Sequence, residues 1–111
     1  MYIKFNIKEG NLIVDLFGEL DHHYAEIART KIDDRIERDN VKKVILNFEN
    51  VTFMDSSGIG VVIGRYKKLK CKSGTLCVAN VRDSVNRVFE LSGLFNVIDY
   101  YDNIPQALKG I

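Results

Sequence analysis

Strand-like and helix-like segments alternate along this chain of 111 residues, and no linker, repeat or low-complexity segment interrupts them. Apolar residues recur at every second position near the N-terminus, and further on they recur at the spacing of one helical face. The expected order is strand, strand, helix, strand, helix, strand, helix, strand, helix. This order predicts an α/β fold: a small, mostly parallel sheet with right-handed crossovers and with helices packed on it. A chain of this length is expected to form a single domain over residues 1–111.

The spacing of the strands predicts how they pair. Only a short turn, Glu9-Gly10-Asn11, separates the first two strands, so they are expected to form an antiparallel hairpin. The nearly continuous apolar segment Val44–Phe48 is typical of a central parallel strand. Thr75–Ala79 and Val97-Ile98 are expected to be two further strands. The sheet would then be parallel except for its N-terminal strand.

Two long amphipathic helices are expected between these strands. Asp21 is a good N-cap for the first, which runs to about Asp39 and places one stripe inward, formed by Ala25, Ala28, Ile32 and Ile36. Its charged residues are expected to lie away from that stripe: Glu26, Arg29, Asp33 and Glu37. The second helix begins at about Ser57 and would bury its own apolar face, formed by Ile59, Val62, Ile63, Tyr66 and Leu69.

Polar side chains follow two of the expected strands, where each strand gives way to a helix. Asp21 follows the second strand and Ser56 the third. If those strands are neighbours, the two turns lie side by side on the edge where open α/β sheets place their ligands and sites. The turn Asp55-Ser56-Ser57-Gly58 presents two hydroxyls and a carboxylate where backbone amides are free and the helix dipole favours negative charge. Such a turn could bind an anion, carry a covalent phosphate, or simply cap the helix through Asp55 or Ser56.

Enzymatic interpretations of this turn have less support. A serine nucleophile needs a base and an oxyanion hole, and the turn is not a Gly-x-Ser-x-Gly elbow. His22 and His23, adjacent on a helix, could not both face one serine or metal, and a solvated helix start is expected for them. The pattern Gly58-x-Gly60-x-x-x-Gly64 has one residue too many for a dinucleotide fingerprint. Gly60 and Gly64 would instead leave a flat helix face for backbone or a partner surface. The alternative that remains is a small nucleotide-binding or hydrolytic α/β domain that uses the same sheet edge.

Composition limits the expected partners and location. A net charge of +1 gives no general attraction to nucleic acid or to an acidic membrane. One basic cluster is expected to be a solvated helix face: Arg65, Lys67, Lys68, Lys70 and Lys72. Cys71 and Cys77 are expected to be reduced packing residues in apolar surroundings. We find no signal peptide and no apolar run near the roughly 20 residues of a membrane span, and we expect a soluble cytoplasmic protein.

Four segments carry a more specific pattern, in one register along the whole chain: Gly18-Glu19-Leu20-Asp21-His22-His23, Phe53-Met54-Asp55-Ser56-Ser57-Gly58-Ile59-Gly60, Gly64-Arg65-Tyr66-Lys67 and Leu91-Ser92-Gly93-Leu94-Phe95. Together they resemble the STAS-domain family of anti-sigma factor antagonists. The Asp-His-His and Gly-Arg-Tyr-Lys elements favour the sporulation branch of that family over its general-stress-response relatives.

This resemblance implies a partner-switching protein that is not an enzyme and has no cofactor. Ser56 would be phosphorylated by an anti-sigma factor that is a serine kinase. The unphosphorylated form would bind that kinase and release the sporulation sigma factor, and a serine phosphatase would regenerate it. Asp21 would contact a basic residue of the kinase. We expect the chain to be a monomer when free, and we expect the rest of its partner-binding surface to include Asp55, Ser57, Gly58 and Ile59.

Overall fold

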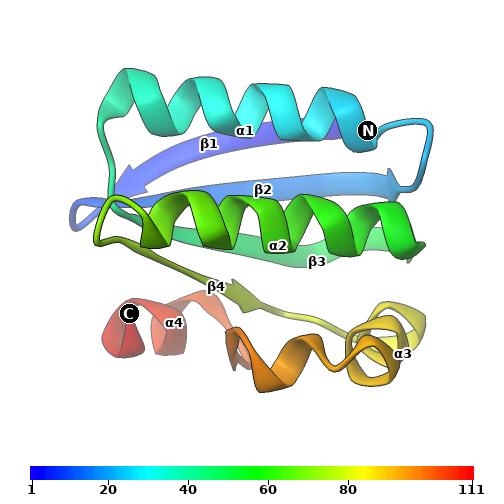
Figure 1. The fold of residues 1–111 in the computed structure, drawn as a ribbon. Helices are drawn as coiled ribbons and strands as arrows, with labels where there is room; N and C mark the ends of the chain where they lie inside the picture. The colour runs from blue at the N-terminus through cyan, green and yellow to red at the C-terminus, as the bar shows by residue number, and fades with distance from the viewer.

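A computed structural model describes all 111 residues of the chain. It contains one five-stranded sheet whose strands follow each other in chain order (Figure 1). The strands are β1 (Tyr2–Lys8), β2 (Asn11–Leu20), β3 (Lys43–Met54), β4 (Thr75–Ala79) and β5 (Asp99–Tyr101). β1 is antiparallel to β2, and every other neighbouring pair is parallel. The predicted α/β fold with an N-terminal antiparallel strand is confirmed.

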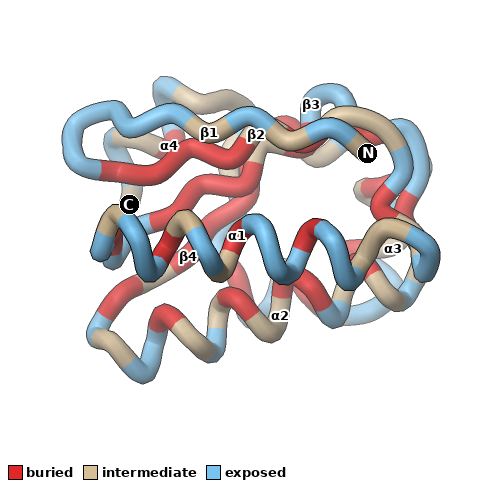
Figure 2. Tube along the Cα trace, turned by 90° about the horizontal axis from the view of Figure 1, so that it is seen from above, coloured by how far each residue is buried: buried red, intermediate tan, exposed pale blue.

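The helices lie on both faces of the sheet, but unequally. They are α1 (Ala25–Asp39), α2 (Ser56–Lys70), α3 (Asp83–Ser92) and α4 (Ile104–Gly110), with a short 3-10 helix, η1, at Leu94–Asn96. α1 and α2 run side by side over one face (Figures 1 and 2), and α3 contributes to the same core. α4 packs on the opposite face. That second face is therefore covered only by one helix of seven residues.

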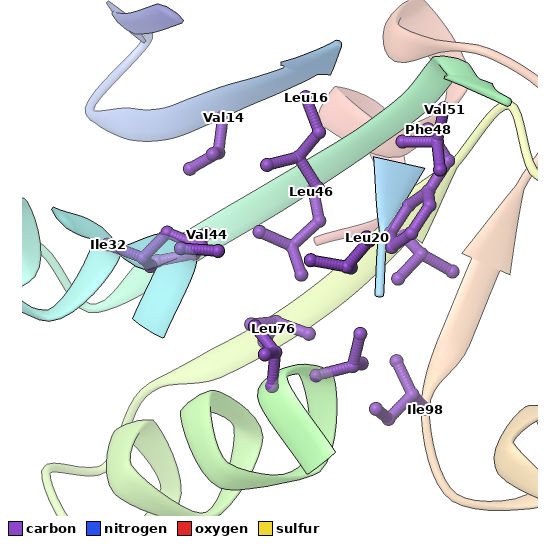
Figure 3. Packing of buried hydrophobic residues seen from close by; sticks show 14 of the residues in the cluster. Val14, Leu16, Leu20, Ile32, Val44, Leu46, Phe48, Val51, Leu76 and Ile98 are labelled. Carbon is purple, nitrogen blue, oxygen red and sulfur yellow. The ribbon is translucent and has the colours of Figure 1, made fainter. Parts of the chain in front are cut away.

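The alternation of side chains along β2, β3 and β4 divides the core into two clusters. On the side of α1 and α2, 22 buried residues pack together, among them Val14, Leu16 and Leu46 (Figure 3). On the side of α4, five buried residues include Ile13 and Ile45. Full burial of one such side chain contributes about 1.5–3 kcal/mol. The larger cluster therefore holds α1 and α2 on the sheet, and with them the turns that begin these helices.

The two cysteines differ, although both were predicted to be packing residues. Cys77 is buried in the smaller cluster. Burial raises the pKa of its thiol to about 12, so the thiol stays protonated at neutral pH. Cys71 is exposed just after α2, and its prediction was wrong. Both thiols are free.

β3 is longer than the sequence predicted. The prediction covered only the apolar segment Val44–Phe48. β3 instead continues to Met54, and its second half pairs with β2 through two register shifts. Glu49 and Asn50 are exposed near the first of these shifts, where an irregular strand tolerates polar residues without ending.

The last strand was placed wrongly. Val97-Ile98 was predicted as a strand, whereas β5 begins at Asp99 and pairs with the end of β4. Val97 directly follows η1 and is half-exposed, and Ile98 is buried in the larger cluster. Ile98 is apolar because it packs in the core, not because it belongs to the sheet.

The buried face of α2 also differs from its prediction. Arg65, expected on a solvated face, is 7% exposed. Its Nε lies 2.8 Å from Oδ1 of Asp33 on α1, a residue expected to point away from the core. Val61 is buried as well, whereas three residues predicted to be buried are only half-buried: Ile59, Ile63 and Tyr66. An ion pair between the two helices therefore forms where the pattern predicted two solvated residues.

This ion pair carries an electrostatic cost that the charge of Asp33 offsets only in part. Burial lowers the pKa of the Arg65 guanidinium, and the charge of Asp33 acts in the opposite direction. Lys68 adds a second cation, with Nζ 3.7 Å from Asp33 Oδ2 and 2.8 Å from Glu37 Oε1. Removing one partner would leave a buried charge without compensation.

We predict that Asp33→Ala lowers the free energy of unfolding by about 3 kcal/mol, the lower end of the cost of breaking a buried ion pair. The matched control is Glu26→Ala, which removes the exposed ion pair with Arg29 on the same helix. It should change stability by less than about 1 kcal/mol. Urea denaturation measures both, and equal losses would show that burial of the Arg65 pair is not what matters.

Candidate functional site at the carboxyl ends of β2 and β3

The pairing of β2 with β3 brings the two predicted turns together. Leu20 and Met54, the last residues of these strands, are register partners. Asp21 and Asp55 follow them directly, so both lie at the same edge of the sheet. The expectation that Asp21 and Ser56 occupy neighbouring turns is confirmed.

One carboxylate joins the two turns. Oδ1 of Asp55 accepts a hydrogen bond from the backbone N–H of Ser57 at 2.9 Å, so Asp55 is the N-cap of α2. Its other oxygen, Oδ2, accepts from the backbone N–H of His22 at 3.1 Å. A carboxylate that accepts two backbone N–H groups is fixed in place. The sequence indicated only the cap, not the bond between the turns.

Asp21 organises its own turn rather than capping α1 directly. α1 begins at Ala25, later than predicted, and its N-cap residue Tyr24 makes no side-chain cap. Oδ1 of Asp21 instead accepts from the backbone N–H of Tyr24 at 3.1 Å, and the Asp21 carbonyl accepts from Ala25 at 2.9 Å. The carboxylate is half-buried and keeps Oδ2 free for another partner. His22 and His23 lie in this exposed turn, not on a helix as predicted.

The two adjacent hydroxyls have different surroundings. Ser56 is the first residue of α2 and is exposed, and its hydroxyl has no hydrogen-bond partner in the chain. Ser57 is half-buried, and its Oγ lies 3.5 Å from Nδ1 of His22. Ser56 is therefore the hydroxyl that an incoming reagent can reach, next to the free amides and positive dipole end of α2.

The glycines of this segment have opposite roles. A Cβ at Gly58 would collide with the Met54 side chain and lie 2.9 Å from the carbonyl oxygen of Leu20, so this glycine lets α2 approach the end of β2. Gly58 is buried beneath the site, and Ile59 is half-buried against the main core. A Cβ at Gly60 or Gly64 would meet no atom within 4 Å. The sequence left two uses for the flat face at Gly60 and Gly64: contact with the chain's own backbone or contact with a partner surface. The open space at both glycines excludes the first.

The site consists of one free hydroxyl, two carboxylates and a helix N-terminus. No group of three or more His, Cys, Asp or Glu side chains is arranged to hold a metal ion. Among the helices, none combines the length and apolar character that crossing a bilayer would require. The arrangement presents an exposed hydroxyl directly after a carboxylate, with the accessibility that a covalent modification would require.

The fold and the site define a small α/β domain that presents an acid-flanked serine at a helix N-terminus. The chain belongs to the STAS-domain family, whose family model matches residues 2–107. The resemblance deduced from the four sequence segments is thereby confirmed.

Two curated relatives are similar along most of their length. The anti-sigma F factor antagonist of Paenibacillus polymyxa is 42% identical over 108 residues, which cover 97% of this chain and 92% of the relative. The anti-sigma-B factor antagonist of Bacillus subtilis (strain 168) is 32% identical over 101 residues, covering 89% and 91%.

Solved structures of SpoIIAA, an anti-sigma factor antagonist, have the same fold. The unphosphorylated form is 35% identical with a TM-score of 0.81, and the match covers 99% of this chain and 98% of SpoIIAA. The phosphorylated form is 34% identical with a TM-score of 0.73 and 97% coverage of each chain.

We predict that Gly58→Ala destabilises the protein by about 1–3 kcal/mol, because the added methyl group must displace Met54 and the Leu20 backbone. Gly60→Ala is the matched control two residues further along the same helix. It should stabilise the protein by about 0.5–1 kcal/mol, since alanine is the better helix former and the space is open. Thermal or urea unfolding measures both, and a neutral Gly58→Ala would show that the contact relaxes freely.

Proposed function

We propose that this chain is an anti-sigma factor antagonist controlled by phosphorylation of Ser56. The unphosphorylated form binds an anti-sigma factor serine kinase in the cytoplasm and releases a sporulation sigma factor. Phosphorylation of Ser56 abolishes this binding, and a serine phosphatase restores it. The single observation that carries the proposal is the exposed, unpartnered Ser56 hydroxyl, which directly follows Asp55 in a turn that is hydrogen-bonded to the turn of Asp21. The 42% identity to an anti-sigma F factor antagonist and the fold shared with phosphorylated SpoIIAA support it.

The geometry suits a chain that is the substrate of a kinase and not a catalyst itself. The Ser56 oxygen attacks the γ-phosphorus of the ATP held by the kinase, ADP leaves, and a base of the kinase takes the hydroxyl proton. This chain needs to supply only an accessible oxygen and a surface for docking. The free Oδ2 of Asp21 is available to a basic residue of the partner, and Phe53, 47% exposed just before the turn, offers an apolar contact.

Phosphorylation is expected to act at the interface without refolding the chain. A phosphoserine adds a charge of about −1.5 to −2 and three acceptor oxygens. At the first position of α2, the free amides and the helix dipole tolerate this charge. Across an interface that already contains Asp21 and Asp55, the added charge repels any acidic group of the partner. Misplaced like charges cost several kcal/mol there, which corresponds to a loss of affinity of several hundredfold or more.

We predict that Ser56→Asp weakens binding to the kinase strongly while the free energy of unfolding stays within about 1 kcal/mol of the unchanged chain. Calorimetric titration and urea denaturation provide the two readouts. The control is Gln106→Asp, which adds the same charge at an exposed position of α4, on the other face of the sheet. It should leave binding unchanged. Extensive unfolding of Ser56→Asp would contradict a mechanism that acts only at the interface.

We predict that Ser56→Ala still binds the kinase but resists phosphorylation by kinase and ATP, whereas Ser57→Ala is still phosphorylated. Mass spectrometry of the peptide that carries the two serines locates the phosphate, and label at Ser57 would refute the site assignment. ATP without kinase is the control and should give no phosphorylated chain and no ADP. Hydrolysis under that condition would support the alternative, a small hydrolytic or nucleotide-binding domain.

A further inference from the structure

A cavity of about 320 Å³ lies at the carboxyl ends of β4 and β5. It is open to solvent on one side and is lined by the loop after β4, by α3, by η1 and by the segment around β5, in yellow and orange in Figure 1. None of its residues belongs to the turns that carry Asp21 and Ser56. Its wall includes polar and aromatic side chains: Asn80, Arg82, Asn86, Phe95, Tyr100 and Asp102. Its volume is at the lower end of the range for small-ligand pockets, and this edge of an open parallel sheet is where such pockets form.

A row of hydrogen-bonded side chains crosses the sheet and ends at the guanidinium of Arg82. Asn47 on β3 donates from Nδ2 to Oδ1 of Asp15 on β2 at 2.8 Å. Asn80, 6% exposed after β4, donates from Nδ2 to Oδ1 of Asn47 at 2.9 Å. Oδ1 of Asn80 in turn accepts from Nη2 of Arg82 at 2.9 Å. The buried Asn80, itself held by this row, thus orients the exposed Arg82 guanidinium through one hydrogen bond.

The charge of Arg82 is not used within the chain. No carboxylate lies within 4.0 Å of Arg82, in contrast to the ion-paired Arg29, Arg35 and Arg65. Four of its five N–H groups have no hydrogen-bond partner in the chain. A guanidinium that is oriented but unpaired suits bidentate binding of a carboxylate from outside.

The cavity is also lined by a carboxylate without an ion-pair partner and by two aromatic rings. Asp102 lines it without an ion pair to any cation, Arg82 included. The rings of Phe95 and Tyr100 have centroids 4.3 Å apart, and Tyr100 is 56% exposed. Packing another flat apolar group against such exposed rings buries apolar surface and is favourable. One cavity therefore combines a cation, an anion and a flat apolar surface.

We propose that this cavity binds a small zwitterion with a flat apolar group, of which an aromatic amino acid is the simplest example. The carboxylate pairs with the free N–H groups of Arg82, the ammonium with Asp102, and the ring lies against Phe95 and Tyr100. A ligand with only one of the two charges would leave the other charged residue of the cavity without a partner.

Titration of the whole chain with phenylalanine, followed by amide and side-chain chemical shifts, tests this proposal. We expect saturable shifts centred on residues 80–86 and 100–102. Arg82→Ala and Asp102→Asn should each weaken binding at least about tenfold. The matched control is Arg87→Ala, an exposed arginine of α3 that does not line the cavity, and it should bind as the unchanged chain does.

The ligand can be varied in the same way. Phenylpropanoate, which lacks the ammonium, and phenethylamine, which lacks the carboxylate, should each bind at least about tenfold more weakly than phenylalanine. Equal binding of phenylpropanoate would overturn the zwitterion in favour of a simple anion, and the absence of saturable binding would overturn the site. Should Arg82→Ala fail to fold, Asp102→Asn decides alone. The phenylalanine titrations, with the chain variants and with the ligand variants, do not depend on kinase binding or on Ser56.

Discussion

The parallel pairing of β2 with β3 is the contact on which the candidate site depends, because it brings together residues more than 30 positions apart in the chain. Leu20 and Met54 end the two strands in register. Gly58 then lets α2 begin against the Leu20 carbonyl, and the Asp55 carboxylate binds backbone N–H groups of both turns. The core beneath α1 and α2 holds this arrangement from below. The site therefore forms only when β2 and β3 are paired, and neither turn alone contains it.

Within this packed arrangement, neighbouring residues differ in their surroundings. Ser56 and Ser57 share a turn and a residue type, yet one hydroxyl is exposed without a partner and the other is half-buried beside His22. The same contrast separates Gly58, which the packing requires, from Gly60, which it does not. Two residues of the same type in this segment therefore differ in their structural roles, and only their surroundings in the fold distinguish them.

Local patterns predicted most of the fold, and they failed where a residue's place is set by distant contacts. Alternating periodicity and short turns indicated the hairpin, the parallel strands and the shared edge of Asp21 and Ser56. No local rule could pair Arg65 with Asp33, since the two charges come from different helices and face each other only after packing. The end of β3 was missed because its register shifts accommodate polar residues, and the last strand was misplaced because Ile98 packs in the core. The Arg82 cavity follows a strand just as Ser56 does, but no recognisable motif marks it.

Ser56 lies at the start of a packed helix and not in a loose segment, and this would determine how any enzyme that modifies it, as proposed above, recognises it. Many modification sites are short extended peptides that adapt to an enzyme's cleft. Here the hydroxyl, the flanking carboxylates and the exposed Phe53 acquire their arrangement only once the whole domain has formed. An enzyme that reads this arrangement ignores nascent, damaged or unfolded copies. A phosphate on Ser56 would then be added only to chains that have folded correctly.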